Sequence, residues 1–181
     1  MNVIKLGGSL LEAEKMLVCL NHILEFNEKI VVVCGGGIFA DTVRAAQKKW
    51  HFDDVVAHKM AVLAMQQTAI MLQNLHPKFT LESTISNLKN HRFSIWLPDI
   101  FDLNAAQISP SWEMTSDSLA AWLATKLEAE KLIVVKSCDV DSTLNVGELT
   151  AKGIVDGEFA NFVNGAKFDL NILSVNTFLN L

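Results

Sequence analysis

The sequence predicts an α/β protein with a mostly parallel β-sheet, and three observations support this fold class. Two hydrophobic strand-like segments, residues 2–4 and 30–34, are each followed directly by a glycine-rich loop. A segment of helical character lies between them, so the chain begins strand–loop–helix–strand–loop–helix. Strands and helices alternate again further along, which is typical of a parallel sheet covered by helices.

Composition excludes several classes of protein. The 181 residues suffice for one domain, and half of them are hydrophobic, with a mean hydropathy of +0.28 that requires a thick core or an oligomer interface. The net charge of −5 argues against a nucleic-acid partner. We expect no membrane segment, because no uninterrupted apolar run approaches about 18 residues and no signal peptide is recognisable. Cys19, Cys34 and Cys138 lack C-x-x-C spacing, which indicates a reducing cytoplasm.

Periodicity predicts the remaining elements. The expected helices cover residues 12–26, 38–50, 55–75 (capped by Asp53 or Asp54) and 115–128 (capped by Thr115 or Ser116). The expected strands are 79–81, 93–97, 132–136 and 171–175, with a short helix between the first two. Residues 98–110 read as a proline-bounded loop, and 137–168 as irregular apart from a helix near 158–163.

The helix at 55–75 is apolar nearly all round. Its polar residues recur about every seven positions and predict one narrow stripe: His58, Lys59, Gln66, Gln67, Gln73 and Asn74. Such a helix is either central to the core or half of a subunit interface, so we expect a homodimer through it or through 38–50. The five histidines show no metal-binding spacing and are expected at the surface or interface, and no metal site is predicted.

The two glycine loops predict a phosphate pocket. They are Gly7-Gly8-Ser9, preceded by Lys5, and Gly35-Gly36-Gly37. Parallel strands joined by a right-handed crossover place both loops at the same edge of the sheet, where backbone N–H groups can meet an anion. A side chain at Gly8 or Gly36 would then occupy space that a phosphate oxygen needs. Lys5 would point into this pocket, or would extend to solvent at the sheet edge.

A dinucleotide-binding site is the competing interpretation of the second loop, because residues 35–40 satisfy G-x-G-x-x-A. That motif requires an acidic residue at the end of the next strand. Asp53 and Asp54 have about the right spacing, but they follow a helix rather than a strand. A Walker A loop is excluded, because no G-K-[ST] follows either glycine loop.

Four segments together resemble the amino-acid kinase superfamily, which includes acetylglutamate, aspartate, carbamate and uridylate kinases. They are Lys5–Ser9, Gly35–Gly37, Thr115–Ala121 and Lys136–Asp141. The resemblance implies a three-layer αβα sandwich and a single domain, residues 1–181. Residues 1–105 would bind the acceptor and the phosphoryl group, and 106–181 the nucleotide. ATP and Mg²⁺ are the implied cofactors.

The resemblance also implies residue roles. Lys5 would hold the transferring phosphoryl group, and Asp117 would orient the catalytic lysines; its other interpretation is a first-turn charge that favours the helix dipole. Lys136 ends a strand at the same sheet edge and would supply a second cation, or would simply lie in solvent. The phosphate and substrate ligands would be Gly7, Gly8, Ser9, Gly35, Gly36 and Gly37. The nucleotide site would include Lys136, Ser137, Asp139 and Asp141, and a D-x-D pair of this kind is otherwise a solvated turn.

The sequence departs from the family pattern in its last third. Ser142 replaces a usual glycine, and only Gly165-Ala166-Lys167 is similar to the segment that carries a second catalytic lysine. The short chain resembles compact kinases of methanofuran and tetrahydromethanopterin cofactor synthesis, which implies a small-metabolite kinase acting on an aminomethylfuran phosphate. The alternatives are a nucleotide-binding sensor or regulatory subunit without turnover, and a NAD-binding oxidoreductase.

Overall fold

The protein is built on an open six-stranded β-sheet in which all neighbouring strands run parallel. The computed structural model describes residues 1–181. The strand order is β3-β4-β2-β1-β5-β6, so β1 lies between β2 and β5 near the centre. The strands are β1 (Asn2–Leu6), β2 (Ile30–Cys34), β3 (Thr80–Glu82), β4 (Phe93–Trp96), β5 (Lys131–Lys136) and β6 (Asp169–Ser174). The predicted α/β class is confirmed, and the sheet is wholly parallel.

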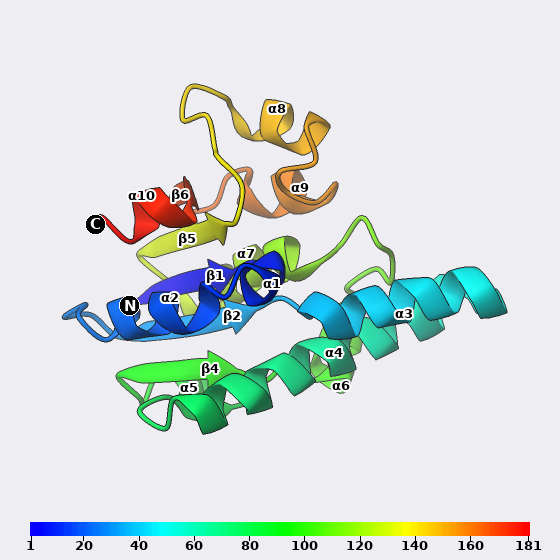
Figure 1. Ribbon diagram of the computed structural model, residues 1–181, viewed down its shortest axis with the longest axis horizontal. Coiled ribbons are helices and arrows are strands. Elements are labelled where there is room, and N and C mark those ends of the chain that lie inside the picture. Colours follow the sequence, from blue (N-terminus) through cyan, green and yellow to red (C-terminus); the bar gives the residue numbers. More distant parts are fainter.

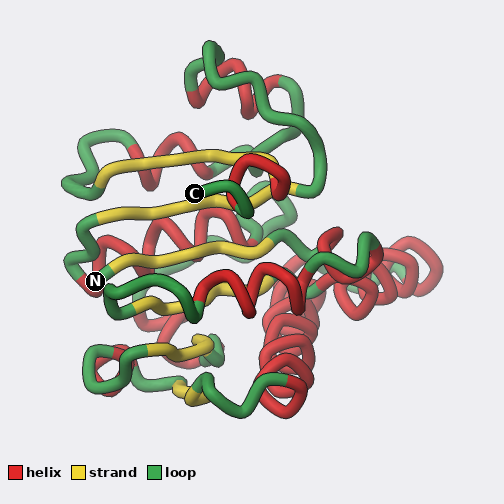
Figure 2. The backbone as a smooth tube through the Cα atoms, turned by 60° about the vertical axis from the view of Figure 1, so that its left-hand side comes forward, coloured by secondary structure: helices red, strands yellow, loops and turns green.

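Helices cover both faces of the sheet, which gives the predicted three layers (Figure 2). Successive side chains of a strand point to opposite faces. Val3 and Val134 enter the core beneath α7 (Ser116–Leu127), together with α5 (Ile85–Leu88) and α9 (Phe159–Val163). Ile4 and Val135 enter the other core, beneath α2 (Met16–Ile23) and α10 (Val175–Phe178).

Two long helices run side by side past the carboxyl ends of the strands: α3 (Gly37–Trp50) and α4 (Asp54–Leu75) (Figure 1). The turn between them contains His51 in the left-handed region, at φ 57°. The Asp53 side chain then accepts a hydrogen bond from the Val56 N–H at 2.8 Å and caps α4. Asp53 was the acidic residue that a dinucleotide site would need, and it serves here as a helix cap.

Four elements differ from the sequence prediction. One is α10, which begins at Val175, where the expected strand 171–175 ends. The helix expected over 12–26 is two helices, α1 (Ser9–Glu12) and α2, because Glu14 adopts a left-handed φ of 55° between them. The supposed loop 98–110 contains α6 (Ile100–Ala105), whose first turn is capped by the Asp99 carboxylate. The supposedly irregular 137–168 contains α8 (Val146–Ala151), which begins at a capping box of Asn145 and Glu148.

The surface of α4 matches the predicted polar stripe only in part. His58 is buried, and Gln66 donates to the Pro98 carbonyl at 2.7 Å, so the expected polar stripe does not face solvent as a unit. The exposed face carries Val56, Leu63 and Ile70. Lys59, Gln67 and Asn74 of the expected stripe are exposed on the same face, between these apolar residues. By length and composition alone α4 could cross a membrane, since it has 22 residues and its most apolar 18-residue window has a mean hydropathy of 1.3. Core helices pass the same test, and 44% of that window is buried in this fold.

Candidate active site

Two lysines project from neighbouring strands toward one helix. Lys5 is the penultimate residue of β1 and Lys136 the last residue of β5. Lys5 pairs with Val134, so Lys136 lies two positions further along β5 and on the same face of the sheet. That face carries α7, whose first turn contains Asp117. Register and strand alternation therefore bring both ammonium groups to the start of α7.

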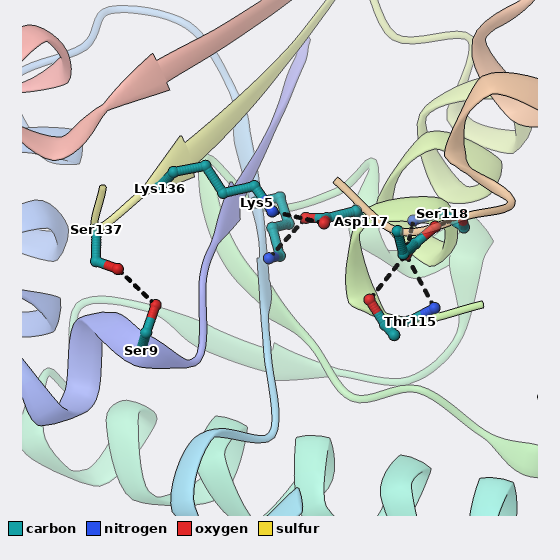
Figure 3. A network of polar contacts seen from close by, with 8 residues as sticks. Lys5, Ser9, Thr115, Asp117, Ser118, Lys136 and Ser137 are labelled. Atoms are coloured by element: carbon teal, nitrogen blue, oxygen red, sulfur yellow. Dashed lines mark hydrogen bonds and ion pairs between the residues drawn. The ribbon is translucent and has the colours of Figure 1, made fainter. Parts of the chain in front are cut away.

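Asp117 holds the two lysines on its two carboxylate oxygens. Nζ of Lys5 lies 2.7 Å from Oδ1, and Nζ of Lys136 donates to Oδ2 at 2.6 Å (Figure 3). The side chains of Lys5 and Asp117 are 4% and 5% exposed, and that of Lys136 is 13% exposed. Two ammonium groups around one carboxylate leave a net positive charge in a partly enclosed site. This arrangement can stabilise the charge of a phosphoryl group.

The electrostatics of the cluster maintain its charges. Burial opposes ionisation of Asp117, but the positive charges of Lys5 and Lys136 outweigh burial and hold the pKa of this carboxyl below its usual value. For Lys136, burial and the charge of Lys5 lower the pKa to about 8, against the opposing effect of Asp117. Lys136 is therefore a cation at neutral pH that loses its proton in mildly alkaline solution.

The glycine loops touch each other at the carboxyl edge of the sheet. A Cβ built on Gly8 would lie 2.5 Å from the Gly37 nitrogen, and one on Gly35 would lie 2.7 Å from the Gly8 nitrogen. A Cβ on Gly36 would lie 2.7 Å from Cβ of Ala40, one turn along α3. The expectation that a Cβ at Gly8 or Gly36 would take the space of a phosphate oxygen is therefore wrong, because protein atoms occupy that space.

Not every predicted glycine offers a free donor. The N–H of Gly7 donates to the Val135 carbonyl at 3.1 Å, and that of Gly35 to the Leu6 carbonyl at 3.0 Å. The N–H groups of Gly8, Gly36 and Gly37 make no hydrogen bond within the protein. These three donors, rather than the whole set, remain available to an anion.

A cavity of about 280 Å³ opens beside the cluster. Lys5, Asp117 and Lys136 line it together with both glycine loops, the first half of α3, part of α4 and the loop before α7. Its other polar and charged side chains are Ser9, Glu12, Asp41, Arg44, His58, Ser111, Thr115 and Ser116. Trp112 adds an aromatic wall; its indole N–H donates to Gln47 at 2.6 Å, and Arg44 stacks 4.4 Å above its ring.

A second cavity of about 400 Å³ lies on the side of the C-terminal segment. Its remaining wall is formed by Glu113, by Thr150 of α8 and by residues 153–157, which lie between α8 and α9. Asp117 and Lys136 line both cavities, as do Arg44, Trp112 and Thr115. The charged cluster thus lies at the junction of two spaces, one on each side.

The residues predicted to bind the nucleotide do not all lie at the charged cluster. Ser137 forms a hydrogen bond of 2.7 Å with Ser9, which joins the loop after β5 to the first glycine loop (Figure 3). Asp139 and Asp141 are exposed, and the Asp141 carboxylate accepts from the N–H and hydroxyl of Thr143 within a turn. Lys167 is exposed and borders neither cavity.

Several residues of the site were not predicted from the sequence. Arg44, His58, Trp112 and Asp156 belong to no short motif, and only the three-dimensional fold places them around the cavities. His58 was expected at the surface or at an interface but is 7% exposed; burial lowers its pKa, and its Nε2 has no hydrogen-bond partner. An apolar helix gives no signal for this, since a buried and an exposed histidine look alike in such a segment.

Comparison with known proteins agrees with this geometry. Residues 1–142 match the sequence model of the amino acid kinase family. The chain is 30% identical over 144 residues to the [5-(aminomethyl)furan-3-yl]methyl phosphate kinase of Methanocaldococcus jannaschii, a match that covers 77% of this chain and 67% of the relative.

Solved structures share the fold at low sequence identity. The uridylate kinase of Archaeoglobus fulgidus superposes with a TM-score of 0.73 at 18% identity, covering 98% of this chain and 93% of that one. The UMP kinase of Bacillus anthracis gives 0.71 at 15% identity, covering 97% and 87%. The sequence match and the charged cluster lead to one conclusion: the chain belongs to the amino acid kinase family and is a small-molecule kinase.

Proposed function

We propose that this kinase transfers the γ-phosphoryl group of ATP to the phosphate of a small aminomethylfuran phosphate, forming a diphosphate. The observation that carries the proposal is the Lys5–Asp117–Lys136 cluster at the junction of two cavities. Support for the acceptor comes from the relative in Methanocaldococcus jannaschii, which is named for this substrate.

The chemistry of the first cavity suits such an acceptor. Glu12 is exposed at its edge and can face an ammonium group, while Trp112 offers an aromatic surface for a furan ring. The free N–H groups of Gly8, Gly36 and Gly37 can bind phosphate oxygens. An acceptor with a cationic end, a flat ring and an anionic end would match these three features.

In the reaction, an oxygen of the acceptor phosphate attacks the γ-phosphorus of ATP. The bond to the β,γ-bridging oxygen breaks, and ADP leaves with the electron pair. Lys5 and Lys136 neutralise charge on the oxygens of the transferring group, and Asp117 keeps the two lysines apart and oriented. A phosphate monoester is largely ionised at neutral pH, with a second pKa near about 6, so the attacking oxygen needs no general base.

The nucleotide would bind on the side of residues 106–181, in and around the second cavity, and the acceptor on the side of 1–105. No group of three or more potential metal ligands gathers in the structure. Mg²⁺ therefore fits as an ion carried mainly by the nucleotide phosphates, which is how this ion is commonly held. Asp139 and Asp141 could add an outer contact from the loop after β5.

We also propose a homodimer in the cytoplasm. Val56, Leu63 and Ile70 recur at seven-residue intervals along α4 and form an exposed apolar stripe. Lys59, Gln67 and Asn74 are exposed beside it. A straight stripe of this kind can pack against its copy across a two-fold axis.

A reducing compartment such as the cytoplasm suits the three free cysteines. Burial raises the pKa of Cys19 to about 11 and of Cys34 to about 12.

The direct test is a ³¹P NMR assay with ATP, Mg²⁺ and synthetic [5-(aminomethyl)furan-3-yl]methyl phosphate. We expect a pair of coupled diphosphate resonances and equimolar ADP. UMP and the dephosphorylated alcohol serve as comparison acceptors. Turnover of the alcohol but not of its phosphate would contradict a phosphate acceptor, and ATP binding without turnover of any acceptor would indicate the sensor alternative.

A further inference from the structure

The start of α7 is capped by a residue from a distant part of the chain. Thr115 occupies the N-cap position, but its side chain makes no capping bond. The Asp156 carboxylate, which lies between α8 and α9, takes this role instead. Its Oδ2 accepts from the N–H of Thr115 at 2.9 Å, the hydroxyl of Thr115 at 2.8 Å and the N–H of Ser118 at 3.1 Å. Its Oδ1 accepts from the hydroxyl of Ser118 (Figure 3).

These four hydrogen bonds hold the residues on either side of Asp117, which forms the ion pairs with both lysines. Asp117 lies between Thr115 and Ser118 in the same first turn, so the carboxylate that fixes the turn also fixes where the Asp117 side chain begins. A second link holds the same two segments together, since the N–H of Glu158 donates to the Glu113 carbonyl at 2.8 Å. The segment that lines the second cavity is thereby attached to the turn that carries the charged cluster.

We propose that Asp156 is a positioning residue for phosphoryl transfer, which acts by holding the first turn of α7 so that Asp117 lies between Lys5 and Lys136. It acts through Asp117 rather than on the reacting atoms. Capping by a charged carboxylate is stronger than capping by a hydroxyl, and it places a negative charge at the positive end of α7. The catalytic part of this inference rests on the proposed kinase reaction.

Asp156 also contributes to the charge state of Lys136. The charged groups around Lys136 are Lys5 from β1, Asp117 from α7 and Asp156 from the segment between α8 and α9. The negative charge of Asp156 raises the pKa of Lys136, against burial and the charge of Lys5. Loss of that charge should therefore make Lys136 release its proton at lower pH, an effect that a purely structural cap would not have.

Two substitutions separate geometry from charge. Asp156→Asn keeps the shape and one carbonyl oxygen, which can still accept the three bonds made by Oδ2, but it removes the charge. Asp156→Ala removes both. Ser118→Ala is the matched control, because it deletes one hydroxyl from the same network and leaves every charge in place.

The first measurement needs no acceptor substrate. In protein with ¹³C-labelled lysine, the titration of the Lys136 ¹³Cε resonance is followed by NMR, with Lys136→Arg to assign the signal. We expect a lower midpoint than wild type in both Asp156 variants and an unchanged midpoint in Ser118→Ala. An unchanged midpoint in Asp156→Asn would overturn the electrostatic role of Asp156.

The second measurement is steady-state kinetics on the proposed reaction. In Asp156→Ala we expect kcat to fall about tenfold to a hundredfold with smaller changes in KM, the size expected when reacting groups are slightly misplaced. Wild-type kcat in a folded Asp156→Ala protein would overturn the positioning role. If wild type does not turn over the aminomethylfuran phosphate, the proposed acceptor is wrong, while the titration still tests Asp156.

Discussion

Gly8 and Gly37 bring the two glycine loops into backbone contact, so tightly that a Cβ on Gly8 would lie 2.5 Å from the Gly37 nitrogen and 2.8 Å from its Cα. Gly37 itself has a left-handed φ of 51°. This contact holds β1 and β2 together at the edge where the free N–H groups gather. Both glycines are therefore required by the packing of the loops, before any ligand is considered.

We predict that Gly8→Ala lowers the free energy of unfolding by about 1–3 kcal/mol, the usual cost of inserting a methyl group where backbone atoms must move. Urea unfolding measures the change. Gly147→Ala is the control, because the nearest atom to its Cβ is a side-chain oxygen at 3.3 Å. If Gly8→Ala has wild-type stability but no longer binds phosphate, the two glycine loops can separate, and the space beside Gly8 is open to a ligand.

Replacement of either lysine of the cluster should affect catalysis more than folding. Lys5→Met and Lys136→Met keep most of the side-chain volume and remove a cation from the transferring group, so we expect turnover to fall roughly a hundredfold to a thousandfold. Lys167→Met, an exposed lysine outside both cavities, should retain wild-type rates. Near-normal turnover in Lys136→Met would show that Lys136 is only an ion-pair partner of Asp117. A large loss in Lys167→Met would make Lys167 the second catalytic lysine.

The pKa of Lys136 predicts opposite pH dependences for activity and stability. Because this pKa is lowered to about 8, kcat/KM should fall as the pH rises through 8 and the cation is lost. The unfolded lysine titrates near 10.5, so between these values the unfolded state binds more protons, and the contribution of this group to stability rises with pH. Lys136→Arg, which stays protonated, should move the alkaline limb of kcat/KM to higher pH. An unmoved limb would show that another group titrates there.

The sequence predicts most of the fold because local signals and tertiary structure agree. Asp53 precedes an apolar helix and caps it, and alternating apolar segments become parallel strands. The predicted site residues that the structure brings together are those on strand ends and the first turn of α7: Lys5, Lys136 and Asp117. Their positions follow from strand register, which a regular sheet determines.

What could not be predicted depends on contacts between distant segments. Asp156 and Ser118 are in one network only because α9 packs on α7, and no local pattern around Asp156 marks it as a helix cap. The space around Gly8 likewise depends on the position of the second glycine loop in the folded protein. The short helices α6 and α8 did carry local cap signals at Asp99 and Asn145, and these could have been recognised.

The stripe on α4 predicts a dimer that a single charge can disrupt. Leu63 is 53% exposed at the centre of the stripe, so Leu63→Asp should give a monomer by light scattering at micromolar concentration. Phe101→Asp is the control, since this 78% exposed side chain lies on α6, outside the stripe. A wild-type monomer would refute the dimer, and a dimer that survives Leu63→Asp would place the contact elsewhere.

His58 should contribute to acceptor binding, because it borders the first cavity with an unpaired Nε2. His58→Phe keeps an aromatic ring and removes both nitrogens. One lost hydrogen bond is worth about 0.5–1.5 kcal/mol, so the KM for the acceptor should rise about twofold to tenfold, with the KM for ATP unchanged. His91→Phe should have no such effect, because His91 precedes β4 at the amino ends of the strands and does not border the first cavity.

His58→Phe should also change how the stability of the protein depends on pH. Burial lowers the pKa of His58 below 6.5, so as the pH falls through 6.5 the unfolded state takes up a proton that the folded state resists, and stability is lost. Without an ionisable group at this position, His58→Phe should lose less stability than wild type between about pH 7 and pH 5, as measured by urea unfolding at several pH values. Equal losses in both proteins, with an unchanged KM for the acceptor, would show that His58 is only a packing residue of α4.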